Sequence, residues 1–273
     1  MRNLLWKFGI VGALLLNGVI YAEIPIKRVQ SFLQEGGDLR MRSMRILQEY
    51  SMVASNNHFR EPDKLLSEDI DRLKEGLKKL LGSLKSEEEK ETFQAARLRD
   101  AQKSLQAAQT ILKTPPSIEK ALEFWKAMDA VRDGLNRSLT HLSQEVYPDE
   151  ETVQGIMYAN RLATIAQRYG ALYLYRVMGK GEALQAQKQL AFLSRFFPHA
   201  ISQVRESTEE LPEAKRKEVE KALKNVEKNL NFFYIMGKSS RHFIPTLIYE
   251  KSDNISKEAQ EIVTLFLQSP TDK

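Results

Sequence analysis

The stretch GGDLRMRSMRILQEYSMVA, Gly36–Ala54, decides the fold class of this 273-residue chain. Apolar or small side chains recur in it at intervals of three and four, the spacing that places them on one face of an α-helix. The stripe, which begins just before the stretch, holds Leu33, Gly37, Arg40, Met44, Leu47, Ser51 and Ala54. The stretch therefore predicts an amphipathic helix with one cation, Arg40, on its packed face, and it places Arg42 at the surface.

The rest of the chain has the composition of an all-helical protein. Glycine and proline number only 13 and 9, and 42% of the residues are hydrophobic, which is enough for a substantial core. Long stretches are rich in Ala, Leu, Glu, Lys, Gln and Arg, and no Val/Ile/Thr run alternates with period two. The sequence predicts an all-α fold.

Glycine, proline and serine clusters divide the chain into helices of similar length. The predicted helices span about 26–56, 63–81, 86–113, 117–145, 150–178, 182–207, 212–236 and 245–268. Because the order of helices and breakers repeats after about 120 residues, we expect two tandem antiparallel four-helix units, 23–146 and 147–273. Four antiparallel helices return the chain to its starting end, so the fifth helix should lie beside the first and run parallel to it, as in a pseudo-dimer.

Residues 1–22 have the pattern of an export signal. MRNLLWK carries two positive charges and precedes FGIVGALLLNGVIYA, fifteen uncharged residues. That run is short for a membrane span, which needs roughly 20 residues, and favours a signal peptide cleaved after Ala22 over an uncleaved anchor. With no cysteine in the chain, a lipoprotein anchor, disulfides and thiolate metal sites are excluded. We expect export, to the periplasm if the source is a Gram-negative bacterium, and membrane attachment only if the segment is not cleaved.

Charge and motif content argue against nucleic-acid binding and against catalysis. The 41 basic and 36 acidic residues are nearly balanced and mixed along helix faces, as in Lys85–Glu91. The four histidines are scattered, and no H-E-x-x-H, G-x-S-x-G or phosphate-binding glycine loop occurs. We expect a non-enzyme with no catalytic residues, no cofactor and no metal site.

Two stretches resemble known sensor domains. GDLRMRSMRI is similar to the box G-S-L-R-M-Q-S-Y-R-L at the start of the periplasmic domain of nitrate and nitrite sensor kinases of the NarX and NarQ kind. It matches at Gly37, Leu39, Arg40, Met41, Ser43 and Arg45 and departs at Asp38, Arg42, Met44 and Ile46. The second stretch, ANRLATIAQRYGALY, residues 159–173, resembles the looser box of PilJ-type domains, which are found in pilus-linked chemotaxis transducers. It matches that box at Ala159, Arg161, Gln167, Arg168, Leu172 and Tyr173, and conservatively at Ile165.

The resemblance implies a site for a small oxyanion such as nitrate or nitrite. In the nitrate sensors the arginine of L-R-M faces its symmetry mate, and this role falls on Arg40; the matching place in the second repeat is Ala163. We expect Arg40 to face Ala163, with Arg161 or Arg168 as a second donor. These two lie about 10 Å apart along a helix, so at most one contributes. Structural roles beside the ligand are expected for Arg45, Ser43, Met41, Ala163 and Gln167.

Alternatives remain open from the residues. Arg40 would instead be structural if it pairs with a buried carboxylate or reaches solvent from a helix end. The leading hypothesis is an exported sensor that acts in signal transduction or chemotaxis through a membrane sensor kinase or chemoreceptor. The alternatives are a ligand-free structural or adaptor protein of the cell envelope, and a membrane-tethered scaffold.

Overall fold

The computed structural model describes residues 25–84, 92–238 and 244–268, and the chain within these ranges is helical without strands. The predicted all-α class is confirmed. The helices are α2 (Ile26–Ala54), α3 (Pro62–Gly82), α5 (Phe93–Ile111), α6 (Ala121–Thr140), η1 (His141–Val146), α7 (Glu151–Val177), α8 (Ala186–Glu206), α9 (Glu213–Lys238) and α10 (Pro245–Leu267). The predicted signal segment, residues 1–22, lies outside the described residues. No helix in the described ranges is long and apolar enough to cross a bilayer.

Local chemistry explains where these helices stop. After α7, Gly179 adopts φ 74°, and the amide of Lys180 donates to the carbonyl of Tyr175 at 2.9 Å, the Schellman arrangement that needs a left-handed residue. After α2, Asn56 takes the same role with φ 54°. The predicted boundaries hold to within a few residues for most helices, but α5 starts at Phe93 rather than about 86, and α6 and α8 each start four residues later than predicted, at Ala121 and Ala186.

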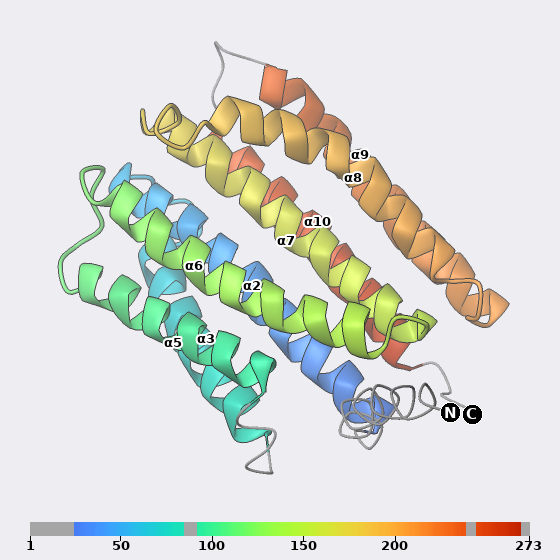
Figure 1. Cartoon of the computed structure of the whole chain (residues 1–273). Coiled ribbons are helices and arrows are strands. Elements are labelled where there is room, and N and C mark those ends of the chain that lie inside the picture. The colour runs from blue at the N-terminus through green and yellow to red at the C-terminus, as the bar shows by residue number, and fades with distance from the viewer. Residues whose placement is uncertain (1–24, 85–91, 239–243, 269–273) are drawn as a thin grey trace, which may run out of the picture.

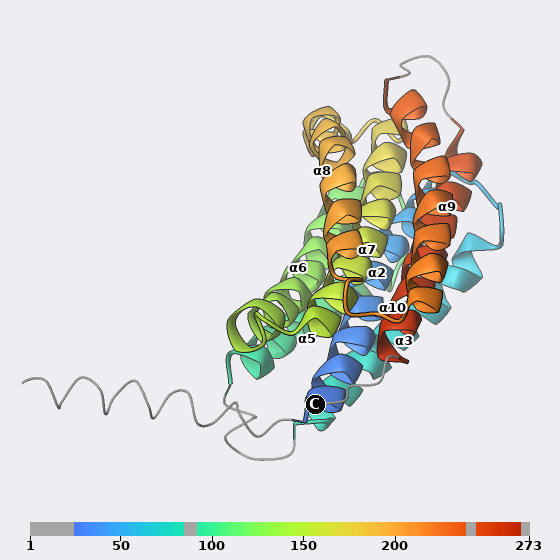
Figure 2. The ribbon, with the colours of Figure 1, turned by 90° about the vertical axis from the view of Figure 1, so that its right-hand side faces the viewer.

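Helices α2 and α7 form the centre of the molecule. Helices α3, α5 and α6 lie on one side of this pair, and α8, α9 and α10 lie on the other (Figure 1). The view turned by 90° again has the pair in the interior (Figure 2). The hydrogen bonds between α2 and α7 follow the same order along both helices, as expected for a parallel pair. Asn160 donates to the Leu33 carbonyl, Arg40 donates to Thr164, and Gln48 donates to the Gln167 carbonyl. The predicted parallel contact of the first and fifth helices is confirmed.

Glycines let the central helices approach closely. A Cβ added to Gly37 would stand 2.1 Å from the side-chain Cγ of Asn160, and one added to Gly170 would stand 2.5 Å from the Gln48 amide oxygen. A larger residue at either position would have to displace the Asn160 or Gln48 side chain, which hydrogen-bonds across the helix pair. The close approach carries the buried polar side chains of α2 directly onto α7.

Candidate functional site

Arg40 lies at the middle of α2, and its side chain is buried between α6 and α7. It is only 1% exposed. Its Nε donates to Thr164 Oγ1 at 3.2 Å, and its Nη1 donates to Asn136 Oδ1 at 2.8 Å and contacts Met157 Sδ at 3.9 Å. All three acceptors are uncharged. Among the described residues no carboxylate pairs with Arg40, and its buried Nη2 has no acceptor.

Burial leaves Arg40 as an uncompensated cation. Loss of water, with smaller contributions from the nearby positive charges of Arg161 and Arg132, lowers the pKa of Arg40 to about 9. The guanidinium therefore stays charged at neutral pH. Neither structural alternative for Arg40 is observed in the described part of the chain: no carboxylate pairs with it, and its side chain does not reach solvent. A buried charge without a partner is unfavourable, and a counter-ion would relieve it.

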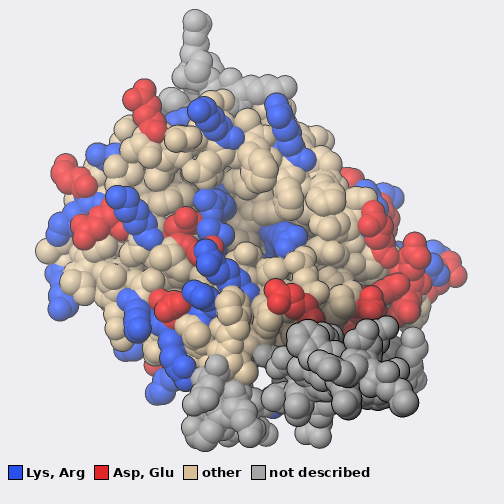
Figure 3. Space-filling model, in the orientation of Figure 1, with Lys and Arg blue, Asp and Glu red and all other residues tan. Residues whose placement is uncertain are grey.

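Arg40 lines a cavity of about 530 Å³ where α2, α6, α7 and α8 meet. Basic side chains lie in and around a hollow on the face seen in Figure 1 (Figure 3). The other charged and polar lining residues are Arg132, Asn136, Arg161, Thr164, Arg168, Lys188 and Gln189. Its apolar lining consists of Ile165, Phe192, Leu193 and Phe196. The cavity thus combines an excess of cations with one apolar wall.

Asp129 on α6 neutralises part of this charge. Its Oδ1 accepts from Arg132 Nε and from Arg168 Nη1, each at 2.8 Å. Burial opposes ionisation of Asp129, but the two guanidiniums outweigh it and lower its pKa. Arg168 is further held by Gln189, whose Oε1 accepts from Nη2 at 3.0 Å. Arg168 is therefore already engaged within the fold.

Arg161 differs from Arg168 because no carboxylate of the described residues pairs with it. Its guanidinium lies 5.8 Å from the ring centre of Tyr158, and burial lowers its pKa. The structure brings all three predicted ligand-binding arginines, Arg40, Arg161 and Arg168, to one cavity. Of the two alternative second donors, Arg161 is the one left available for an anion.

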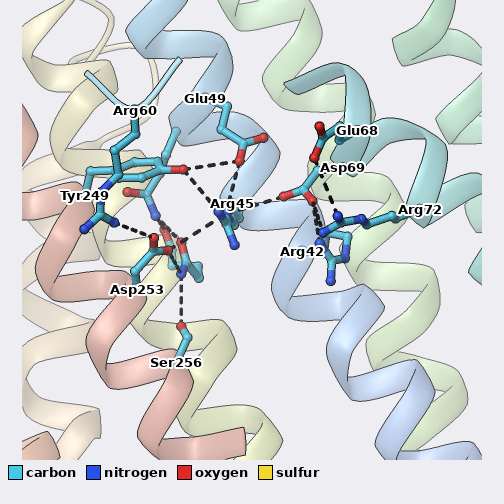
Figure 4. A network of polar contacts seen from close by, with 12 residues as sticks. Arg42, Arg45, Glu49, Arg60, Glu68, Asp69, Arg72, Tyr249, Asp253 and Ser256 are labelled. Atoms are coloured by element: carbon cyan, nitrogen blue, oxygen red, sulfur yellow. Dashed lines mark hydrogen bonds and ion pairs between the residues drawn. The ribbon is translucent and has the colours of Figure 1, made fainter. Parts of the chain in front are cut away.

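Arg45 belongs to a separate cluster of ion pairs that joins α2 to α3 and α10 (Figure 4). Its Nε lies 3.1 Å from Glu49 Oε1, 3.4 Å from Asp69 Oδ2 and 3.8 Å from Asp253 Oδ1. Arg42 also binds Asp69, and its side chain is 13% exposed. The expectation that Arg42 is a surface residue is wrong, because α3 covers it with a carboxylate.

Gln167 links this ion-pair cluster to α7. Its Nε2 donates to Asp253 Oδ1 at 3.1 Å and to Ser256 Oγ at 3.0 Å, both on α10. Ser256 also donates to the carbonyl of Ala163 at 3.3 Å. Neither Gln167 nor Ala163 is among the residues that line the cavity.

The remaining predicted neighbours of Arg40 do not reach the cavity either. Ser43 Oγ donates to the backbone carbonyl of Arg40 at 2.7 Å, and Met41 is buried in the core. Arg40 forms its hydrogen bond on α7 with Thr164, the residue after the expected neighbour Ala163. Because Thr164 also donates to the Asn160 carbonyl at 2.9 Å, its Oγ1 is held with its lone pairs toward Arg40.

Sequence reasoning missed the contributions of α6 and α8. Arg132 and Asn136 are four residues apart on α6, and Lys188, Phe192 and Phe196 continue at the same interval on α8. Each set has the spacing of one helix face. A helix face alone does not reveal which other helix it meets, so nothing in the sequence connected these residues with Arg40.

Comparison with known proteins adds no assignment. No family model, no curated protein and no solved structure matches this chain. The function is therefore argued from the geometry of the site.

Proposed function

We propose that this chain is an exported binding protein that holds a small oxyanion of the nitrate or nitrite type on Arg40 and relays its presence to a membrane signalling partner. One observation carries the proposal. Arg40 is a fully buried guanidinium that lines a cavity, has no carboxylate partner among the described residues and keeps one buried nitrogen, Nη2, without an acceptor.

The chemistry of the group suits a planar oxyanion. A guanidinium offers parallel N–H donors in a fixed fork and remains charged near neutral pH. Thr164 and Asn136 hold Nε and Nη1, so the fork has a set orientation before a ligand arrives. An anion on Nη2 would also lie near the positive charge of Arg161, and it would relieve the unfavourable burial of Arg40.

The architecture that we propose is a tandem PilJ-like module with units 23–146 and 147–273 after a cleaved signal. Its support is the parallel packing of α2 on α7 and the direct meeting of Gly37 with Asn160. These two residues are equivalent when GDLRMRSMRILQEY is aligned with NRLATIAQRYGALY, as expected for partners close to a pseudo-twofold axis.

A relay to a partner has a physical basis in the position of the cavity. Its lining comes from α6 in the first half of the chain and α8 in the second half, while α2 and α7 contribute Arg40 and Arg161. An anion drawn between these cations would change the balance of repulsion between the two halves. We propose that a membrane sensor kinase or chemoreceptor reads the resulting change in their spacing.

Thermal unfolding of the mature protein in the presence of nitrate, nitrite and chloride tests the proposal. A ligand that binds only the folded chain raises the melting temperature with concentration, by an amount set by RT ln(1 + [L]/Kd). We expect a rise with nitrate or nitrite beyond that with chloride, and its loss in Arg40→Lys, which keeps the charge but removes the fork. No anion-specific rise in the wild type would refute the proposal.

A second candidate function, a ligand-free structural or adaptor protein, is favoured by one observation. Two of the three Arg40 nitrogens are already satisfied by Asn136, Thr164 and Met157. On this alternative Arg40 ties α2 to α6 and α7, so Arg40→Ala would destabilise the protein, and no anion would change its melting temperature.

A further inference from the structure

The cavity is much larger than a free inorganic oxyanion requires. A water molecule occupies roughly 30 Å³ in the liquid, and an ion of four heavy atoms needs only a few times that volume. The cavity measures about 530 Å³, within the range of pockets that hold drug-sized molecules. A nitrate on Arg40 would leave most of this space to be filled by something else.

The chemical character of the lining changes with depth. At the buried end lies the guanidinium of Arg40, with Thr164 beside it. At the exposed end lies Phe192 of α8, which is 64% exposed although it is a large hydrophobic residue. Phe192 stacks on Phe196, with ring centres 6.0 Å apart and an angle of 23° between the planes. Both rings line the cavity together with the buried side chain of Leu193.

An exposed aromatic pair beside a cationic pocket fits a ligand with two parts. Ligand pockets are lined by apolar and aromatic side chains with a few polar groups that fix orientation. Here the orienting groups are Arg40 and Arg161, and the apolar wall is formed by Phe192 and Phe196. A ligand with an apolar body would remove the exposed Phe192 ring from water, which is favourable.

We propose that the ligand of this cavity is an amphipathic organic anion, with one carboxylate, sulfonate or phosphate head group bound by Arg40 and Arg161 and an aromatic or branched aliphatic body packed on Phe192 and Phe196. This inference rests on the proposed function, because the head group occupies the same Arg40 site. It adds the class of molecule that carries the oxyanion.

Pairs of anions that share a head group test the two parts separately. Methanesulfonate and benzenesulfonate, and likewise acetate and benzoate, differ in the apolar body but not in charge. Isothermal titration calorimetry with the mature protein should give a dissociation constant at least about tenfold lower for the aromatic member of each pair, since it buries a ring against two others.

Variants on the exposed rings sharpen the test. Phe192→Ser should reduce the preference for the aromatic member to less than about threefold and leave methanesulfonate binding unchanged. The matched control is Ile235→Ser on α9, because Ile235 is 68% exposed and does not line the cavity. This variant should keep the wild-type preference. Arg40→Lys should weaken the binding of both members.

The outcomes separate this inference from the proposed function. If methanesulfonate or nitrate binds as tightly as benzenesulfonate, and Phe192→Ser changes nothing, the organic-anion inference is overturned while the oxyanion site stands. If none of these anions binds, the proposed function fails and this inference fails with it. Aromatic anions that bind equally well to Arg40→Lys would overturn both.

Discussion

Replacing Arg40 by methionine should make the ligand-free protein more stable and abolish its response to anions. Burial lowers the pKa of Arg40 from the ordinary value of a guanidinium to about 9, and at about 1.4 kcal/mol per pKa unit this corresponds to about 5 kcal/mol of penalty on the folded cation. Methionine fills a similar volume without charge. It forfeits the hydrogen bonds to Thr164 and Asn136, each worth about 1.5–2 kcal/mol because the donor is charged. The net expectation is a gain of about 1–2 kcal/mol.

Urea unfolding and thermal unfolding at pH 7, both followed by far-ultraviolet circular dichroism in a buffer of low anion content, measure this gain. A chain of this size shifts its melting temperature by about 2–4 °C per kcal/mol, so Arg40→Met should melt about 2–8 °C higher than the wild type. The same variant should show no rise in melting temperature with nitrate or benzenesulfonate. Stability and ligand response therefore change in opposite directions.

The same substitution at Arg45 is the matched control. Arg45 lies on α2 as well, but it is surrounded by Glu49, Asp69 and Asp253. Arg45→Met leaves the carboxylates of Asp69 and Asp253 without their shared cation and should destabilise the protein by about 3–5 kcal/mol. If Arg40→Met destabilises the protein as Arg45→Met does, then Arg40 is a structural residue and the reasoning is refuted.

Two further predictions concern the packing around α2. Burial, together with the neighbouring Asp69, raises the pKa of Glu49 well above its usual value of 4.5. Above pH 4.5 the folded chain therefore holds a proton on Glu49 that the unfolded chain has released. The free energy of unfolding should fall as pH rises from about 4.5 toward neutrality. Glu49→Gln should flatten that fall in urea unfolding at pH 5 and pH 7.5, and an unchanged slope would contradict the assignment. Gly37→Ala should cost about 1–3 kcal/mol, because its methyl group would displace Asn160. Gly82→Ala is the control, because a Cβ added at Gly82 has nothing within 4 Å, and it should be neutral or slightly stabilising. Equal melting temperatures for the two alanine variants would rule out the close approach of α2 and α7 at Gly37.

The helices themselves were readable from the sequence because their determinants are local. Periodicity of three and four indicates which segments are helical, and the breakers Asn56 and Gly179 mark where α2 and α7 end. The parallel neighbourhood of α2 and α7 followed from counting antiparallel helices. Both inferences need only short-range chemistry and the length of the chain.

The sequence by itself also determined that Arg40 is an anomaly, since a cation in an apolar stripe is visible without a structure. Only the tertiary structure decided that its neighbours are Asn136 and Thr164 rather than a carboxylate, and that the exposed Phe192 borders the same cavity. It also decided that Arg42, expected at the surface, is paired with Asp69. The physical reason is that helical periodicity encodes which face of a helix is buried, whereas the partner of a buried charge depends on how distant helices meet.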